Sequence, residues 1–178
     1  MLRVAGIEQE SMIDGEGIRF VLFMQGCSHN CTGCHNPETH DFHAGTSMKM
    51  EDIIKLTESD PLIDGVTLSG GDPFFQAKKL IPLCKYWKSK GLNIWAYTGF
   101  IFDEFMKYKE NKQSDDRLTS DMIELLNYLD VVVDGPFIID KRTLGKEYIG
   151  SSNQRLIDVQ KTLKSNAIIL YELNNDNW

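Results

Sequence analysis

The chain has 178 residues, of which 42% are hydrophobic, which is enough for one globular domain over residues 1–178 with a sizeable core. Its formal net charge of -7 disfavours nucleic acid and anionic membrane surfaces as partners, because both would be repelled. No apolar run approaches the roughly 18 residues of a membrane span, and the first residues lack the apolar core of a signal peptide. We therefore expect a cytoplasmic protein.

Apolar strand-like runs alternate with helical stripes along the chain. The run at residues 18–24 predicts a strand buried on both faces, and a first helical stripe begins near Met50. The further expected elements are strands at 66–69, 92–98, 130–135 and 167–171, helices at 77–87, 101–108, 121–129 and 156–163, and a surface loop at 109–120. This alternation predicts an α/β fold, a partial (β/α) barrel with a mostly parallel sheet. Function is then expected at the carboxyl ends of its strands.

A cysteine-rich loop, "GCSHNCTGCHNPETH", follows the first of these strands at residues 26–40. Cys27, Cys31 and Cys34 have C-x3-C-x2-C spacing, which indicates a metal site in a reducing compartment. Three thiolates complete neither a tetrahedral zinc site nor a [4Fe-4S] cluster, so a fourth ligand must come from elsewhere. Both sites stay open at this point. For zinc, the fourth ligand would be one of the four histidines, His29, His35, His40 or His43.

A glycine-rich turn, "SGGDP" at residues 69–73, follows the next expected strand. Paired glycines expose backbone polar groups with no side chain in the way, which suits the close approach of a small polar ligand. Such a sequence by itself also fits an ordinary turn. Beside a three-cysteine loop it favours a ligand that bridges the open corner of a cluster and this backbone edge.

These segments together resemble the radical S-adenosylmethionine superfamily, which combines C-x3-C-x2-C with a "GGEP"-like turn, here "GGDP". The stretch "DGEGIRFVLFMQGCSHNCTGCHNP" is also similar to the activases of glycyl-radical enzymes. "DVVVDGPF" and "YIGSSNQRLIDVQ" resemble the branch that activates anaerobic ribonucleotide reductase, and the resemblance runs from about Ile13 to Val159. Gly33 stands where the superfamily usually has an aromatic residue. This branch commonly shows that glycine.

The resemblance implies a radical S-adenosylmethionine fold and an oxidoreductase activity. A [4Fe-4S] cluster on Cys27, Cys31 and Cys34 would bind S-adenosylmethionine and cleave it reductively, and the resulting 5'-deoxyadenosyl radical would take hydrogen from a glycine of the reductase. The implied partners are anaerobic ribonucleotide reductase and a flavodoxin-like or other low-potential electron donor. The alternatives are another radical S-adenosylmethionine enzyme, either a formate-lyase activase or one that acts on a small molecule, and a zinc-binding interaction module.

Further site residues follow from the same resemblance. Gly70, Gly71 and Asp72 are expected at the methionine amino group, while Gly33, Cys34 and His35 are expected near the nucleoside, with His35 a candidate for packing on the adenine. Other polar or glycine positions have open roles. The strand ends at 97–99 and 134–135 fit either the cavity mouth or simple turns. Residues 150–155 fit a cap of the last helix, closure of the site or a contact to the partner. Arg19 fits a structural cation, and Cys84 fits inert core packing.

Overall fold

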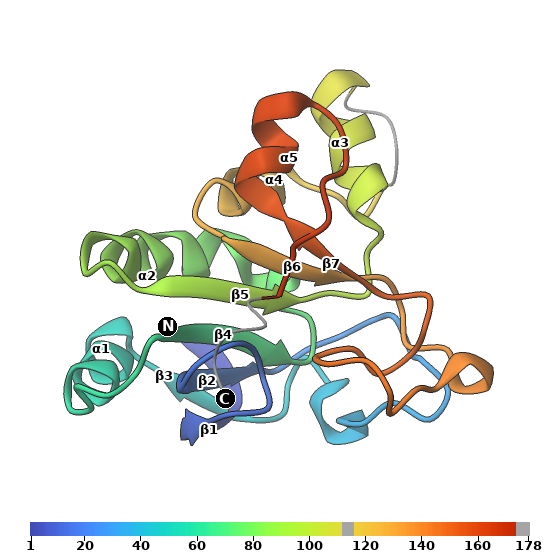
Figure 1. Cartoon of the computed structure of the whole chain (residues 1–178). Helices are drawn as coiled ribbons and strands as arrows, with labels where there is room; N and C mark the ends of the chain where they lie inside the picture. The colour runs from blue at the N-terminus through green and yellow to red at the C-terminus, as the bar shows by residue number, and fades with distance from the viewer. Residues whose placement is uncertain (112–115, 174–178) are drawn as a thin grey trace.

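The computed structural model describes residues 1–111 and 116–173 (Figure 1). Its strands are β1 Leu2–Ser11, β2 Arg19–Met24, β3 Thr46–Met48, β4 Gly65–Gly70, β5 Asn93–Tyr97, β6 Val131–Asp134 and β7 Arg155–Asp158. Its helices are α1 Met50–Glu58, α2 Ala77–Ser89, α3 Phe102–Asn111, α4 Ser120–Leu126 and α5 Val159–Ser165, with short 3-10 helices η1 Pro37–Thr39, η2 Pro73–Gln76 and η3 Ile139–Lys141. None of the helices found in the described ranges has the length and apolar character needed to span a bilayer.

All seven strands form one sheet in the order β3-β1-β2-β4-β5-β6-β7. The four central strands, β2, β4, β5 and β6, run parallel, whereas β1, β3 and β7 pair antiparallel with their neighbours. The predicted α/β class is confirmed as a mixed sheet with helices. Fewer strands are parallel than expected, because β1 pairs antiparallel with β2 and β7 pairs antiparallel with β6. The pairing describes an open sheet, so the partial barrel stays a prediction.

The C-terminal part differs from the expected pattern. Residues 156–163 were expected to be helical, but Leu156 and Ile157 lie in β7, and α5 begins only at Val159. Two adjacent apolar residues that face opposite sides of a sheet fit a strand as well as a helix. The expected strand at 167–171 is limited to an isolated bridge between Ile157 and Leu170. Of the expected loop at 109–120, the first residues extend α3, and residues 112–115 lie outside the described chain.

The two faces of the sheet carry two separate clusters of buried hydrophobic residues. In β2, Phe20, Leu22 and Met24 belong to the main core, which also contains buried residues of α1, α2 and α4. The opposite face carries a smaller cluster around Trp95 and Val133. Side chains alternate between the two faces along each strand. One face therefore packs against the helices, and the other face is available to line a cavity.

Arg19 is a buried structural cation on that second face, only 1% exposed. Its guanidinium donates hydrogen bonds to the Val66 carbonyl at 2.6 Å, to Thr67 Oγ1 at 3.1 Å and to Asn93 Oδ1 at 3.1 Å, and it lies 5.6 Å from the Trp95 ring centroid. Burial lowers the pKa of Arg19 to about 10. The interpretation of Arg19 as structural is confirmed, since these bonds tie β2 to β4 and β5.

The helix-covered core predicts a large difference between two leucine truncations. Leu68 in β4 is fully buried, whereas Leu144 is 92% exposed. Leu68→Ala should lower the free energy of unfolding by about 2–5 kcal/mol, because it removes packed methyl groups and leaves a cavity. Leu144→Ala, the control, should change it by less than about 0.5 kcal/mol. Urea unfolding measures both, and equal effects would contradict the assignment of the core.

Candidate active site at the carboxyl ends of the strands

A cavity of about 480 Å³ lies where the segments after β2, β4, β5 and β6 meet. It is lined by both sequence motifs that were expected to act together. The predicted residues in its wall are Cys27, Cys31, Cys34, His35, Gly70, Gly71 and Asp72. Figure 1 shows the segment near residue 35 beside the segment that contains η3, at the lower right. The structure therefore brings the cysteine loop and the glycine-rich turn to one site.

Backbone hydrogen bonds close the base of the cysteine loop. Gly26 N donates to the Thr39 carbonyl at 2.8 Å, and Cys27 N donates to the His40 carbonyl at 3.1 Å. Inside the loop, Cys34 N donates to the Cys31 carbonyl at 3.1 Å. These bonds hold the two ends of the loop together, so the three cysteines between them can face one space.

Gly33 has a positive φ of 73° and lies outside the cavity lining. A Cβ atom at this position would lie 2.7 Å from Ile139 Cδ1, so the residue is in tight contact with η3. The left-handed backbone and the missing space both explain why glycine stands here. The expected contact of Gly33 with a nucleoside stays a prediction. His35 lines the cavity, with its ring centroid 4.8 Å from that of Phe137.

The glycine-rich turn is in backbone contact with the cysteine loop. Gly71 N donates to the Met24 carbonyl at 2.8 Å, and Asp72 N donates to the Gly26 carbonyl at 3.0 Å. A Cβ atom on Gly71 would lie 2.5 Å from Gly26 O, and one on Gly70 would lie 2.7 Å from Met24 N. Side chains at these two positions would therefore push the two segments apart.

Asp72 lines the cavity, but its carboxylate is occupied by groups of the protein. Oδ1 accepts a hydrogen bond from Phe74 N at 2.9 Å, so Asp72 caps η2. Oδ2 is within hydrogen-bond distance of Thr98 Oγ1 at 2.7 Å, Gly99 N at 3.0 Å and His29 Nε2 at 2.8 Å. The side chain is 1% exposed. Direct contact of this carboxylate with a ligand, which the sequence suggested, stays a prediction, and its observed role is to join neighbouring segments.

Residues 150–155 brace the far wall of the cavity. Gln154 Oε1 accepts hydrogen bonds from Gly150 N at 2.9 Å and Ser151 N at 3.1 Å, and Gln154 Nε2 donates to the Gly135 carbonyl at 3.0 Å. The expectation that this stretch caps the last helix is wrong, because β7 intervenes and Asp158 caps α5.

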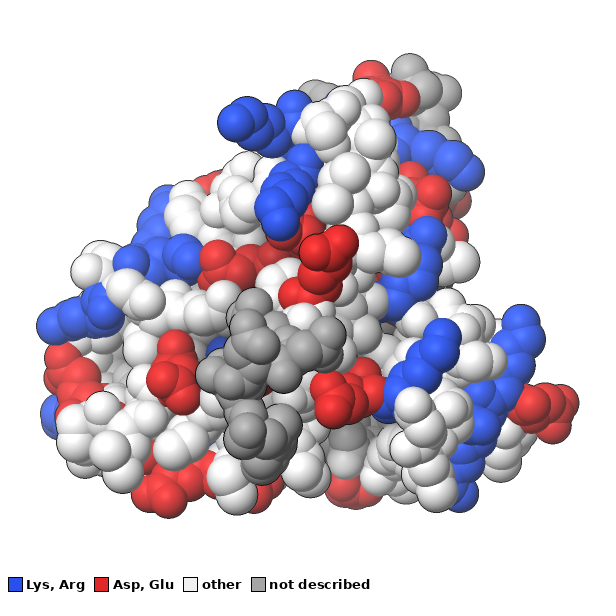
Figure 2. Space-filling model, in the orientation of Figure 1, with Lys and Arg blue, Asp and Glu red and all other residues white. Residues whose placement is uncertain are grey.

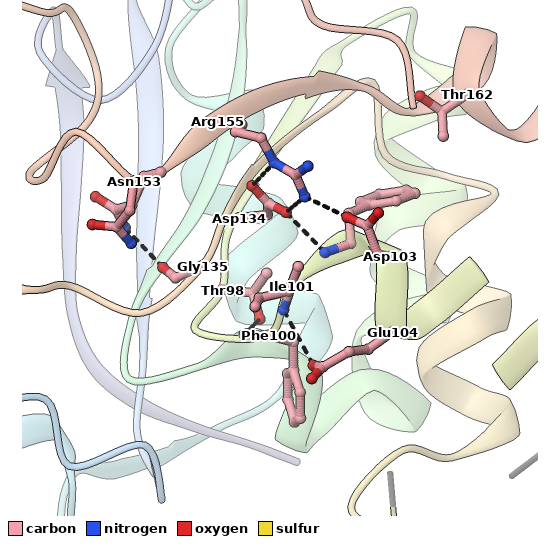
Figure 3. Close-up of polar contacts among 12 residues, drawn as sticks. Thr98, Phe100, Ile101, Asp103, Glu104, Asp134, Gly135, Asn153, Arg155 and Thr162 are labelled. Atoms are coloured by element: carbon pink, nitrogen blue, oxygen red, sulfur yellow. Dashed lines mark hydrogen bonds and ion pairs between the residues drawn. The ribbon is translucent and has the colours of Figure 1, made fainter. Parts of the chain in front are cut away.

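Arg155 holds the end of β6 against α3 in the arrangement drawn in Figure 3. Its guanidinium bonds to Asp134 through Nε at 3.1 Å and to Asp103 through Nη2 at 2.7 Å. Asp134 Oδ2 also accepts from Phe102 N at 2.8 Å. The hydrogen bond to Asp134 is the main cause that raises the pKa of Arg155, and Arg155 in turn lowers the pKa of Asp103. Arg155 and Asp134 therefore support the wall without lining the cavity.

Sequence reasoning identified part of the remaining lining. Among the strand ends whose roles were open, residues 97–99 and Gly135 do line the cavity. Phe137 and Tyr148 were not singled out, although the quoted segments "DVVVDGPF" and "YIGSSNQR" contain them. Nothing in their spacing distinguishes a wall residue from a buried aromatic.

The thiols differ in their surroundings. Burial raises the pKa of Cys27 to about 11 and also raises the pKa of Cys31. Cys84 lies fully buried in α2, and burial raises its pKa strongly. Its expected role as inert packing agrees with this position. The thiols of Cys27 and Cys31 are therefore mostly protonated until a metal displaces their protons.

The donor set fits a cluster bound at three corners. Cys27, Cys31 and Cys34 surround one cavity, where thiolates could each hold a different iron. A single zinc ion would need a fourth ligand beside the three thiolates. His29, one candidate fourth zinc ligand, is instead bonded to Asp72.

These environments predict unequal reactivity of the four cysteines. In the folded, metal-free chain at pH 8, iodoacetamide should label Cys27 at least about tenfold more slowly than in the unfolded chain, because only the thiolate reacts. Raising the pH to 10 should speed this labelling. Cys84 should remain unlabelled until urea unfolds the chain. Peptide mass spectrometry measures each site, and labelling of native Cys84 as fast as Cys27 would contradict the structure.

Comparison with known proteins adds a family to this geometry. The 4Fe-4S single cluster domain family matches residues 13–157. An anaerobic ribonucleoside-triphosphate reductase-activating protein of Haemophilus influenzae is 33% identical over 151 residues, which cover 80% of this chain and 89% of that protein. A pyruvate formate-lyase-activating enzyme of Clostridium pasteurianum is 39% identical over 98 residues, covering 52% of this chain and 41% of that enzyme.

Among solved structures, QueE from Escherichia coli overlaps with a TM-score of 0.43 and 16% identity, covering 55% of this chain and 52% of that one. The match to the reductase-activating protein, in contrast, extends over most of both chains, and the cluster-domain match includes all three loop cysteines. The chain therefore belongs to the family of the anaerobic ribonucleoside-triphosphate reductase-activating proteins.

Proposed function

We propose that the protein activates an anaerobic ribonucleotide reductase by generating a glycyl radical on it. The observation that carries this proposal is the meeting of Cys27, Cys31 and Cys34 with Gly70 and Gly71 in one cavity. A three-cysteine cluster leaves one corner free, and the glycine turn offers backbone groups beside it. The membership of the chain in the reductase-activating family supports the choice of partner.

Each part of the cavity has a role in this proposal. The three cysteines hold a [4Fe-4S] cluster, and the backbone at Gly70 and Gly71 receives the methionine amino group of S-adenosylmethionine. His35, beside Phe137, offers an aromatic surface for the adenine. When bound, the reduced cluster supplies one electron that splits S-adenosylmethionine into methionine and a 5'-deoxyadenosyl radical, which takes a hydrogen atom from the partner's glycine.

The cavity suits a small-molecule cofactor. Its volume of about 480 Å³ falls within the roughly 300–1,000 Å³ of typical ligand pockets. Aromatic side chains of Tyr97, Phe137 and Tyr148 form part of the wall. Exclusion of water protects a reactive radical from side reactions.

Two partners complete the proposed reaction. One is the reductase, whose glycine-bearing segment must reach the cavity, and the other is a flavodoxin-like or other low-potential donor that reduces the cluster. Acidic and basic side chains are interspersed on the face of the molecule shown in Figure 2. We place the reaction in the cytoplasm, where reducing conditions keep free thiols available for iron.

A second candidate function is the activation of another glycyl-radical enzyme. The match to a pyruvate formate-lyase-activating enzyme supports this candidate. That match covers about half of this chain, whereas the match to the reductase-activating protein covers 80%. If 5'-deoxyadenosine forms but a glycyl radical appears only on a formate lyase, the second candidate holds.

Substitution of one loop cysteine should abolish the activity, whereas substitution of the core cysteine should not. Cys31→Ala removes one of the three proposed iron ligands, so the reconstituted chain should lose its cluster and form no glycyl radical doublet on the reductase. Cys84→Ala, the matched control, should keep the iron content and the doublet. Iron analysis and electron paramagnetic resonance measure both, and a colourless wild-type chain that binds one zinc would contradict the proposal.

A methyl group in the glycine turn should impair the cofactor site. Gly71→Ala places its Cβ 2.5 Å from Gly26 O, so the turn must move away from the cysteine loop. We expect at least about a tenfold weaker response of the reduced-cluster spectrum to S-adenosylmethionine, equal to the loss of about one good hydrogen bond. Gly145→Ala, where a Cβ would meet only Thr143 Oγ1 at 4.0 Å, serves as the control. An unchanged titration of Gly71→Ala would refute the assignment of this turn.

A further inference from the structure

His29 lies between two of the loop cysteines and turns its side chain into the protein. The side chain is 7% exposed, although the neighbouring Ser28 and Asn30 are exposed. Buried histidines are satisfied by specific partners, because an unpaired ring nitrogen in the interior is costly. The partner of His29 is Asp72 of the glycine-rich turn, at 2.8 Å from Nε2 to Oδ2.

The roles of donor and acceptor in this pair follow from the other contacts of Asp72. Its carboxylate accepts from the backbone amides of Phe74 and Gly99, which are obligatory donors. An ionised carboxylate accepts hydrogen bonds only, so His29 Nε2 carries the proton and donates it to Oδ2. The hydrogen bond is therefore charge-assisted, a class stronger than bonds between neutral groups.

Packing of the His29 ring against neighbouring residues also holds the side chain in this position. The His29 ring meets Phe100 edge-on, with centroids 4.7 Å apart, and lies 5.8 Å from Phe75. A Cβ on Gly99 would lie 2.5 Å from His29 Cγ, so the ring occupies the space that a side chain there would need. The segments after β4 and β5 thus form a socket that accepts an imidazole ring.

Through this socket His29 connects three segments that build the cavity. It belongs to the cysteine loop, Asp72 belongs to the turn after β4, and Thr98 and Gly99 follow β5. Two other contacts join the loop to the turn, and both lie at Gly26 near the base of the loop. His29 is the contact placed between the first two cysteines themselves.

We propose that His29 is a positioning residue that holds the Cys27–Cys31 segment in a ligand-ready shape before the cluster is assembled. This inference rests on the proposed function only in that the loop receives an iron-sulfur cluster. Without the bond to Asp72, the segment between the two cysteines loses its polar link to the segments after β4 and β5 and keeps only the packing of the ring. The loop then samples open shapes, and iron is captured more slowly.

The test uses the whole chain, purified without oxygen and without metal. His29→Phe keeps a ring for the socket but removes the donor, whereas His29→Gln offers an amide donor at similar reach. His29→Asn carries the same amide on a side chain one methylene shorter. His43→Phe is the matched control, because His43 belongs to the same region and its side chain is exposed.

Amide hydrogen exchange of residues 27–34 reports the shape of the metal-free loop. We expect exchange about tenfold faster in His29→Phe and His29→Asn, the effect of losing one hydrogen bond to a charged group, and exchange near the wild-type rate in His29→Gln and His43→Phe. The rate of iron uptake during anaerobic reconstitution should fall in the same two variants. The thermal unfolding midpoint of His29→Gln should stay close to that of the wild type.

Unchanged exchange and iron uptake in His29→Phe would overturn the inference. If His29→Phe does not fold, the comparison of His29→Gln with His29→Asn tests the inference. Equal exchange rates and equal iron uptake in these two variants would also refute a role for the hydrogen bond. The exchange measurement needs neither cofactor nor reductase. A slow-exchanging loop in a chain that never yields a glycyl radical would therefore contradict the proposed function while leaving the role of His29 intact.

Discussion

The backbone contact between Gly26 and Gly71 is the constraint on which the rest of the site depends. Asp72 N donates to the Gly26 carbonyl at 3.0 Å, and no Cβ fits between the two glycines. Parallel pairing of β2 with β4 ends at Met24 and Gly70, so the two strands deliver their following segments to the same place. Close backbone approach then converts two separate motifs into one wall of a cavity.

The site was predictable from sequence where chemistry depends on residue type and spacing. Cys27, Cys31 and Cys34, together with the Gly70–Gly71 turn, were expected at the carboxyl ends of neighbouring strands, and they line one cavity. Asp72 shows the limit of such reasoning. Its position in the motif suggested a ligand contact, but its oxygens are bonded to His29, Thr98 and backbone amides. Partners that come from distant segments leave no pattern in the local sequence.

The fold was predictable where periodicity was unambiguous. The central strands and α2 were expected from long apolar runs or stripes, whereas β1, with polar residues at many positions, was missed. Residues 156–158 were assigned to a helix because a short apolar pair fits both periods. Pairing with β6 decides between them, and Arg155 also bonds to Asp134 across the two strands. Tertiary contacts of this kind override local preference.

Polar side chains in this fold do more than face solvent or ligand. Arg19, Asp72 and Asp134 are each buried to 1% exposure, and each bonds to groups from two or more segments. Burial of a charge is tolerable only when its hydrogen-bonding capacity is met, so each of these residues fixes the relative position of its partners. Arg19 does so beneath the cavity, Asp134 behind its far wall, and Asp72 between the cysteine loop and the strand ends. The apolar core stabilises the sheet, and the hydrogen bonds of these three buried charged residues determine where the loops after its strands meet.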